Sequence, residues 1–278
     1  MRIGIFAKTF PGKDPASVLA ASAASGFAGV QYNMACSGLE PLPDNLPAAA
    51  IRAVARAAAA HRQTIFALSA TWNMAHPDSA LRTEGLRRFE GLARAGRAMG
   101  TRILTLCTGS RDAEDQWRHH PDNASPQAWA DMRASLDGAL DLAETHDLLL
   151  AVEPELANVV DSATAARRLI DQAGSDRLRI VLDPANLFEQ ASPARQRYLV
   201  EQAVDLLADR IVLAHAKDRA PDGSFVTAGS GVIDFDHFLR GLQAAGFAGP
   251  VVTHGLTAAE APRVARFLTG IVAGIVAG

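Results

Sequence analysis

The sequence predicts an α/β protein of the single (β/α)8 TIM barrel class, and three observations support this prediction. Short runs of β-branched and aliphatic residues alternate with Ala- and Leu-rich stretches whose apolar residues recur at helical spacing. The alternation repeats eight times, which is the number of units in a closed barrel. The length of 278 residues is also typical of such a barrel.

The predicted strands are short apolar runs closed by polar or turn residues. Leu148–Glu153 is the clearest of them, because its apolar run is too short for an independent helix and Pro154 follows it. The full set is Arg2–Phe6, Gly29–Tyr32, Thr64–Ser69, Arg102–Cys107, Leu148–Glu153, Leu178–Leu182, Ile211–His215 and Val251–His254.

The predicted helices lie between these strands and have plausible start and stop residues. Asp234, and either Ser162 or Thr164, are suited to cap helix starts, whereas Gly26 and Gly246 fall where helices should stop. The full set is Pro15–Ser25, Ala48–His61, Ser79–Met99, Pro126–His146, Ser162–Ala173, Ala194–Ala208, Phe235–Ala245 and Ala258–Gly270.

We expect residues 1–278 to form one barrel domain, because no linker rich in Ser, Gly or Pro divides the chain. A doubly wound open sheet is the structural alternative. Such a sheet usually has a glycine-rich phosphate-binding fingerprint after its first strand. Here residues 7–11 read Ala-Lys-Thr-Phe-Pro, which is not such a fingerprint.

The overall charge favours a small-molecule partner. The net charge is −3 and the pI is about 6.2, so no global basic field is present to attract a nucleic-acid backbone. We therefore expect a small carbohydrate substrate and no nucleic acid. Apolar faces on barrel helices often form dimers or tetramers, and a homo-oligomer stays open as an alternative.

Cysteine usage and the chain ends predict a cytoplasmic protein. Cys36 and Cys107 have no metal-binding spacing, and we expect both to be free thiols. Residues 1–6 lack the long apolar region of a signal peptide. The apolar tail 267–278 is interrupted by glycines and is too short to span a bilayer, so we interpret it as the last helix and its frayed end.

Metal-ligand residue types end four consecutive predicted strands. They are Glu153, Asp183, His215 and His254. In a barrel the carboxyl ends of the strands meet at one mouth, where active sites form. Carboxylate and imidazole groups together suit a divalent ion such as Mn²⁺, Mg²⁺, Zn²⁺ or Co²⁺, whereas a lone Asp or His after a strand is more often a helix cap or loop residue.

Other polar residues at the same mouth are candidates for substrate binding. Asn73 and His76 follow the third strand, although a simple turn explains them equally well. The long segment 108–126 resembles a functional lid, in which Trp117 would cover a sugar face and Arg111 or Arg118 would pair with phosphate or carboxylate. A surface loop with solvated charges is the alternative. Asn186, which follows Asp183, completes the predicted substrate-binding set.

These residues resemble the xylose isomerase-like TIM-barrel superfamily of sugar-phosphate isomerases and epimerases, which includes an apurinic-site endonuclease branch. The resemblance covers nearly the whole chain. Its most specific motifs are Val152-Glu153-Pro154, Leu182-Asp183, His215-Ala216-Lys217-Asp218, and the segments 229–234 (Gly-Ser-Gly-Val-Ile-Asp) and 249–252 (Gly-Pro-Val-Val).

The resemblance implies that Glu153, Asp183 and His215 bind the metal, and the fourth position departs from the family. The family has a closing glutamate on its last strand, where this chain has His254. A proton shuttle between two glutamates would need the closing glutamate that His254 replaces. One imidazole nitrogen cannot both bind metal and transfer a proton, so the sequence does not predict such a shuttle here. Glu155 is the expected replacement base if Pro154 lets the chain continue extended.

We therefore expect a divalent-metal-dependent sugar or sugar-phosphate isomerase or epimerase that transfers protons through a metal-bound enediolate. Glu155, Lys217 and Glu153 would be its catalytic residues, with Lys217 steadying an enediolate oxygen or a phosphate. A keto-polyol (inosose-type) dehydratase shares the first step and is the main alternative. A phosphodiesterase of the endonuclease type and a non-catalytic binding protein are further alternatives.

Overall fold

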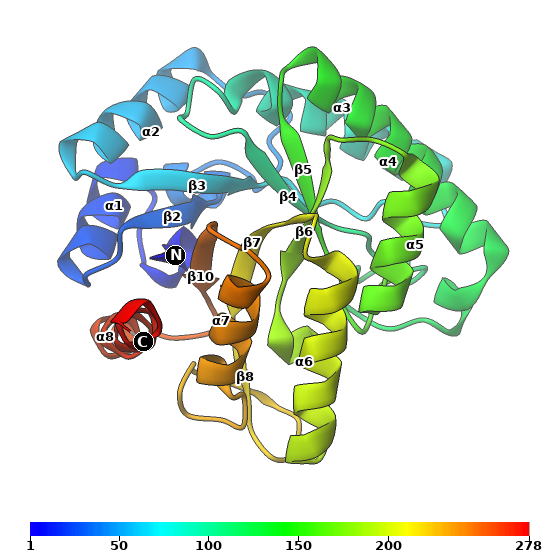
Figure 1. Cartoon of the computed structure of the whole chain (residues 1–278). Coiled ribbons are helices and arrows are strands. Elements are labelled where there is room, and N and C mark those ends of the chain that lie inside the picture. The colour runs from blue at the N-terminus through cyan, green and yellow to red at the C-terminus, as the bar shows by residue number, and fades with distance from the viewer. Residues whose placement is uncertain (278) are drawn as a thin grey trace.

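Eight parallel strands close into a barrel with helices around it, as the sequence predicts (Figure 1). The computed structural model describes residues 1–277. Around the barrel the strands follow chain order, from β1 through β7 to β10, which closes the ring by pairing with β1. All eight neighbouring pairs are parallel, so the carboxyl ends of the strands share one face of the molecule.

The barrel strands lie within one residue of their predicted bounds. They are β1 Arg2–Phe6, β2 Gly29–Tyr32, β3 Thr64–Ser69, β4 Ile103–Cys107, β5 Leu149–Glu153, β6 Leu178–Leu182, β7 Ile211–Ala216 and β10 Pro250–Thr253. The agreement is close because strands covered on both faces must be apolar almost throughout, which makes them stand out in the sequence.

Eight α-helices cover the barrel over the described residues. They are α1 Pro15–Ala24, α2 Ala48–Ala60, α3 Ser79–Ala95, α4 Pro126–Thr145, α5 Ala163–Ala173, α6 Pro193–Leu207, α7 Phe235–Ala244 and α8 Ala261–Ala277. Helix α8 continues past Gly270, so the prediction of a frayed tail was wrong as far as Ala277. Ile271, Val272 and Ile275 pack on the core there and stabilise the last turns.

Helix starts and stops follow the predicted capping residues. The side chains of Ser162 and Asp234 accept hydrogen bonds from the amides of Ala165 and His237, which satisfies otherwise free donors of α5 and α7. Gly246 has a φ of +82°, a conformation that ends α7 at low cost only with glycine.

Alternation along the strands separates the barrel interior from the helix layer. Phe66, Ala151, Val181, Leu213 and Val252 belong to a small buried cluster distinct from the main core. Phe66 fills space that two glycines leave open, since a Cβ on Gly4 would lie 2.7 Å from its ring and one on Gly29 would lie 2.9 Å from it. This base of apolar side chains supports the mouth of the barrel above it.

A hairpin that the sequence did not predict lies beyond β7. Its strands, β8 (Asp218–Arg219) and β9 (Phe225–Val226), pair antiparallel. The fully buried Asp218 carboxylate accepts hydrogen bonds from the amides of Gly229, Gly231 and Ile233, which holds the following loop against the hairpin. This arrangement projects Phe225 at the mouth of the barrel.

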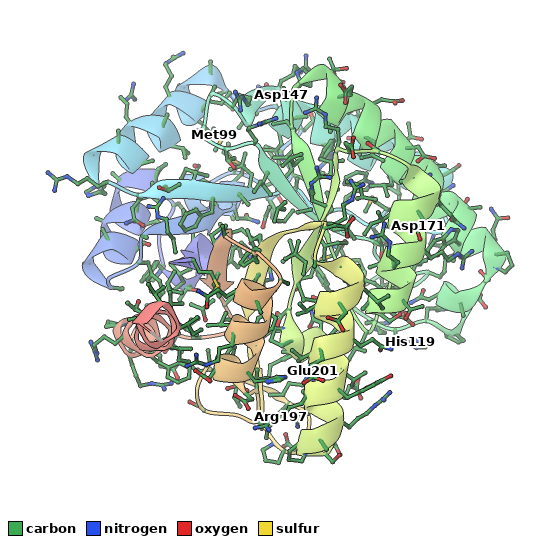
Figure 2. All side chains as sticks on the ribbon, viewed as in Figure 1. Met99, His119, Asp147, Asp171, Arg197 and Glu201 are labelled. Atoms are coloured by element: carbon green, nitrogen blue, oxygen red, sulfur yellow. The ribbon has the colours of Figure 1, made fainter. Side chains whose placement is uncertain are left out.

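Short 3-10 helices follow several strands, and charged side chains cover the outside. The short helices are η1 Ala7–Thr9, η2 Met34–Ser37, η3 Pro121–Ala124 and η4 Pro184–Asn186. Asp171 on α5 and Glu201 on α6, both labelled in Figure 2, are exposed examples. None of the described helices has the length and apolar character needed to cross a membrane. Cys36 and Cys107 are buried free thiols, as predicted.

Candidate metal centre

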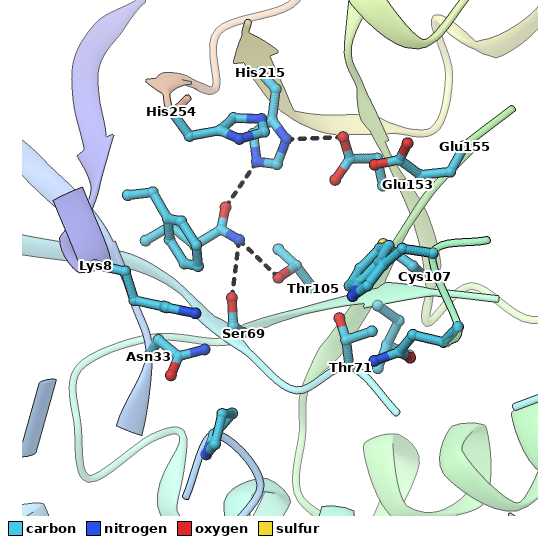
Figure 3. A pocket seen from close by; sticks show the side chains of 16 residues that line it. Lys8, Asn33, Ser69, Thr71, Thr105, Cys107, Glu153, Glu155, His215 and His254 are labelled. Carbon is cyan, nitrogen blue, oxygen red and sulfur yellow. Dashed lines mark hydrogen bonds and ion pairs between the residues drawn. The ribbon is translucent and has the colours of Figure 1, made fainter. Parts of the chain in front are cut away.

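Strand alternation brings the four predicted metal ligands together. Each follows an interior residue by two positions, as Glu153 follows Ala151 and His215 follows Leu213, so each side chain points into the barrel mouth. Glu153, Asp183, His215 and His254 each offer a ligand atom, and these atoms lie within 4.8 Å of one another. Figure 3 shows three of them, Glu153, His215 and His254, converging from different strands.

The four groups form two bonded pairs. Nδ1 of His215 lies 3.0 Å from Oε1 of Glu153, and Nε2 of His254 lies 3.3 Å from Oδ2 of Asp183. The two imidazole rings meet edge to face with centroids 4.7 Å apart. One nitrogen of each ring therefore faces a carboxylate, and all four groups border the same small space.

Gln31 on β2 sets the orientation of His215. Its amide nitrogen donates to the hydroxyls of Ser69 and Thr105, so its carbonyl oxygen faces Nε2 of His215 at 2.8 Å (Figure 3). Because a carbonyl only accepts, Nε2 of His215 must carry hydrogen. The other nitrogen, Nδ1, is left to face Glu153 and the cluster.

Burial and neighbouring charges shift the pKa values of the clustered groups in opposite directions. Burial alone would raise the pKa of Glu153, but His215 and Lys217 together bring it below its usual value. Burial alone would also raise the pKa of Asp183, which Lys217 and His254 bring below its usual value. Burial lowers the pKa of His254, so this imidazole favours the neutral form that binds metal.

Glu155 shares the cavity with Glu153, although β5 ends before it. One carboxylate oxygen of Glu155 lies within 4.8 Å of one from Glu153 and of the Cys107 sulfur. Burial, followed by the negative charge of Glu153, raises the pKa of Glu155 to about 7. Glu155 thus lies on the same side as Glu153 and places a proton-accepting group beside the cluster.

Lys217 lies among the acidic groups. Its Nζ is 3.9 Å from both Oε1 of Glu155 and Oδ2 of Asp183. Burial would lower the pKa of this ammonium, but Asp183 and Glu155 more than compensate and raise it. Lys217 thus stays charged and supplies one fixed positive charge to the site.

The donor set fits a divalent ion. Two carboxylates and two imidazoles satisfy the coordination preferences of Mn²⁺, Zn²⁺ and Co²⁺, and mixed nitrogen and oxygen sites are less typical of Mg²⁺. In the described part of the chain, Asn186 adds a buried polar atom without a partner beside these groups. Its Nδ2 donates to Oε1 of Glu153 at 2.8 Å, while its buried Oδ1 has no partner among the described residues.

A cavity of about 360 Å³ opens above the cluster. Its lining includes Trp117 and Gln116, from the long segment after β4, and Lys8 and Asn33. The segment is held in place by Asn158, which accepts from the amide of Gly109 and donates to the carbonyl of Gln116. The predicted lid is thus an ordered wall of the cavity.

The structure places three of the predicted substrate-binding residues elsewhere. Asn73 shapes loops by donating to the carbonyl of Ser110, His76 contacts the carbonyl of Ala113, and Arg111 forms a 2.6 Å ion pair with Asp131. None of the three is among the described residues that line the cavity, because each polar group is engaged beneath the loops. Trp117 lines the cavity, and Asn186 contacts the metal cluster.

Sequence reasoning missed Gln31, Ser69 and Thr105. All three line the cavity, and they connect it to His215. The signal was a polar residue in a short strand that is otherwise apolar, since Gln31 lies between Val30 and Tyr32. Such a residue in a buried strand requires partners, but the sequence does not say which ones.

The fold and the site define a barrel protein whose candidate metal centre lies at the carboxyl ends of its strands. Residues 19–269 match the family model described as xylose isomerase-like TIM barrel, and the chain belongs to this family. The predicted resemblance is therefore confirmed. No curated protein is similar enough in sequence to count as a relative.

Solved structures share the fold at low sequence identity. The chain is similar to 3-keto-D-glucoside 4-epimerase, YcjR, from E. coli (TM-score 0.76, 18% identity, 100% of both chains covered). It is also similar to a D-tagatose 3-epimerase-like protein (TM-score 0.78, 15% identity, covering 99% of this chain and 98% of the other). A third structure is the IOLI protein with a binding zinc atom (TM-score 0.75, 19% identity, 99% of both chains).

Proposed function

We propose that this protein is a divalent-metal-dependent sugar isomerase or epimerase. The observation that carries the proposal is the convergence of two carboxylates and two imidazoles within 4.8 Å, beside the carboxylate of Glu155. The names of structurally similar proteins support the substrate class, since they include a 3-keto-D-glucoside 4-epimerase and a D-allulose 3-epimerase in complex with D-allulose.

Glu153, Asp183, His215 and His254 would hold the ion. A divalent ion held there supplies a Lewis acid that polarises adjacent oxygens of a sugar and so acidifies the carbon-bound hydrogen between them. Because two of the four donors are imidazole nitrogens, the site should bind Mn²⁺, Zn²⁺ or Co²⁺ in preference to Mg²⁺. That the IOLI structure contains zinc agrees with this preference.

Glu155 would remove the carbon-bound proton. A general base works best when its pKa lies near the working pH, and the pKa of Glu155 is raised to about 7. The Lys217 ammonium, 3.9 Å from Glu155, would stabilise the negative charge that develops on a neighbouring sugar oxygen as the proton leaves. Glu153 is the second candidate proton carrier, because its carboxylate adjoins that of Glu155.

Return of the proton decides the reaction type. A single base that returns the proton to the adjacent carbon on the same face produces an isomerase, whereas inversion at one carbon needs an acid on the opposite face. Loss of a neighbouring hydroxyl in place of proton return would make the protein a keto-polyol dehydratase. Among the described cavity residues, Glu155 is the only carboxylate outside the four candidate ligands, and one such base is sufficient both for the isomerase and for the first step of the dehydratase.

The test is proton exchange with solvent. Metal-loaded protein is incubated in deuterated water with a panel of ketoses, inososes, their phosphates and glycosides that carry a free carbonyl group, and deuterium at carbon is followed by NMR. We expect at least one substrate to take up deuterium, with the product separating isomerase, epimerase and dehydratase. Failure of the entire panel to exchange, in protein that holds stoichiometric metal, would contradict the proposal.

A further inference from the structure

A second cavity adjoins the first on the far side of Glu155 and Trp117. It has a volume of about 450 Å³, and its walls include Trp117, His119, Asn158, Glu189, Arg219 and Phe225. Glu155 and Trp117 line both cavities, so the two spaces are neighbours across these side chains. Small-molecule sites range from about 300 to 1,000 Å³, and each cavity reaches that size by itself.

Two exposed aromatic rings line this second cavity. Trp117 and Phe225 are each 51% exposed, and they are two of only five large apolar side chains so exposed in the described part of the chain. An aromatic ring left in water at the rim of a polar cavity is typical of a binding surface for a ligand with apolar faces. The CH-rich face of a sugar ring is such a surface.

Contacts hold the backbone of Trp117 and the ring of Phe225 in place before any ligand arrives. The backbone amide of Trp117 donates to the Asp115 carboxylate at 2.9 Å. Phe225 lies on the hairpin formed by β8 and β9, with Nζ of Lys217 and Cζ of Arg219 at 4.0 and 4.1 Å from its ring centre. The Phe225 ring and the backbone that carries Trp117 are therefore preorganised, which reduces the entropy lost on binding.

The cationic groups of this cavity are already engaged. The Arg219 guanidinium donates to the carbonyls of Ala185 and Gly223, and Lys217 lies between Glu155 and Asp183. The acids Glu155 and Glu189 line the same cavity and balance the two cations. A phosphate needs unopposed, free cationic donors, so this cavity is better suited to an uncharged ring.

We propose that the second cavity binds the second ring of a glycoside, so that the substrate is a two-ring sugar and not a free or phosphorylated monosaccharide. This inference rests on the proposed function, in which the reacting ring occupies the first cavity near the metal cluster. The glycosidic oxygen would pass between Glu155 and Trp117, and the second ring would stack on Trp117 and contact the exposed part of Phe225, whose ring also lies against Lys217 and Arg219.

Calorimetric titration of the metal-loaded protein tests this inference without requiring turnover. The probes are cellobiose, maltose and sucrose against D-glucose, D-fructose and D-glucose 6-phosphate. We expect at least one disaccharide to bind about tenfold or more tightly than any monosaccharide probe, phosphorylated or not. Phe225→Ala, which changes only the second cavity, should weaken that binding about three- to tenfold and leave monosaccharide binding unchanged. Trp117 lines both cavities, so Trp117→Ala should weaken disaccharide binding by a larger factor than monosaccharide binding.

Tyr198→Ala is the matched control, because Tyr198 is an equally exposed aromatic residue (50%) on α6 that lines neither cavity. Disaccharide affinity that is no higher than monosaccharide affinity, including no detectable binding, would overturn the inference, as would tighter binding of the phosphate. Equal losses in Tyr198→Ala would overturn the stacking role. Disaccharide binding through Trp117 without deuterium exchange by any sugar would instead refute the proposed function alone.

Discussion

The carbonyl oxygen of Gln31 lies 2.8 Å from Nε2 of His215, and this contact determines which nitrogen of the imidazole faces the metal cluster. Ser69 and Thr105 fix the amide of Gln31 by accepting its two hydrogens. Residues from three strands, β2, β3 and β4, thus support one candidate ligand, His215. Outer contacts of this kind keep a histidine ligand in one tautomer and one orientation.

Gln31→Ala should therefore weaken metal binding about 10- to 100-fold. The ligand atoms stay in place, but the ring of His215 loses the acceptor that holds Nε2 protonated. Metal affinity is measured by competition with a chelator. Gln63→Ala is the control, because Gln63 is also buried and bonded to Ser22 and Phe27, yet lies outside the cavity-lining residues. Equal metal affinities of the two variants would contradict the supporting role.

His254→Ala tests whether the histidine in the place of the family's glutamate is a ligand. We expect metal affinity to fall about 100-fold, since one of four donors is lost. Metal content per protein is measured after dialysis, together with the dissociation constant. His237→Ala is the control, because His237 pairs with Glu201 on the outer helices. Unchanged metal binding by His254→Ala would assign His254 to the substrate alone.

Glu155→Gln separates proton transfer from metal binding. The variant keeps the size of the side chain but cannot accept a proton, so the rate of deuterium exchange should fall about 10²- to 10⁴-fold. Metal content should stay within the error of the wild type, because the four candidate ligands are intact. Exchange at the wild-type rate would show that Glu155 is not the base, and Glu153 would be the next candidate.

The exchange rate should rise with pH through a single ionisation. The base must be deprotonated to act, and burial together with the charge of Glu153 raises the pKa of Glu155 to about 7 in the absence of an ion. A bound divalent ion adds positive charge and lowers that pKa. In the metal-loaded protein the rise of the exchange rate should therefore have its midpoint at or below about pH 7. The pH–rate profile checks this, and a profile that is flat from pH 4 to 8 would argue against Glu155.

Asp218→Asn should destabilise the protein by about 3 kcal/mol. The buried carboxylate accepts hydrogen bonds from the backbone amides of Gly229, Gly231 and Ile233. The NH2 group of an asparagine side chain cannot accept, so at least one of these donors would lose its partner. Chemical denaturation of the metal-free protein measures the difference. Asp236→Asn is the control, because Asp236 forms only an exposed pair with Arg240 on α7, and its loss should cost well under 1 kcal/mol.

The sequence alone determined the barrel and the four candidate ligands. Strands that are covered on both faces must be apolar almost throughout, and Leu149–Glu153 and Leu178–Leu182 were recognisable for that reason. Parallel strands in a closed ring bring their carboxyl ends to one mouth, so the position of Glu153, Asp183, His215 and His254 at strand ends was enough to predict their convergence.

Only the tertiary structure decided what surrounds those ligands. The contact of Gln31 with His215 joins residues 184 positions apart, and no local pattern encodes such a pairing. Asn73, His76 and Arg111 have the right chemistry for a sugar site, yet loop packing uses their polar groups elsewhere. The hairpin contributes Arg219 and Phe225 to the second cavity, and Asp218 of the same hairpin holds the following loop through the amides of Gly229 and Gly231. Periodicity reports which face of an element is buried, whereas the partner of each polar group depends on how distant loops meet.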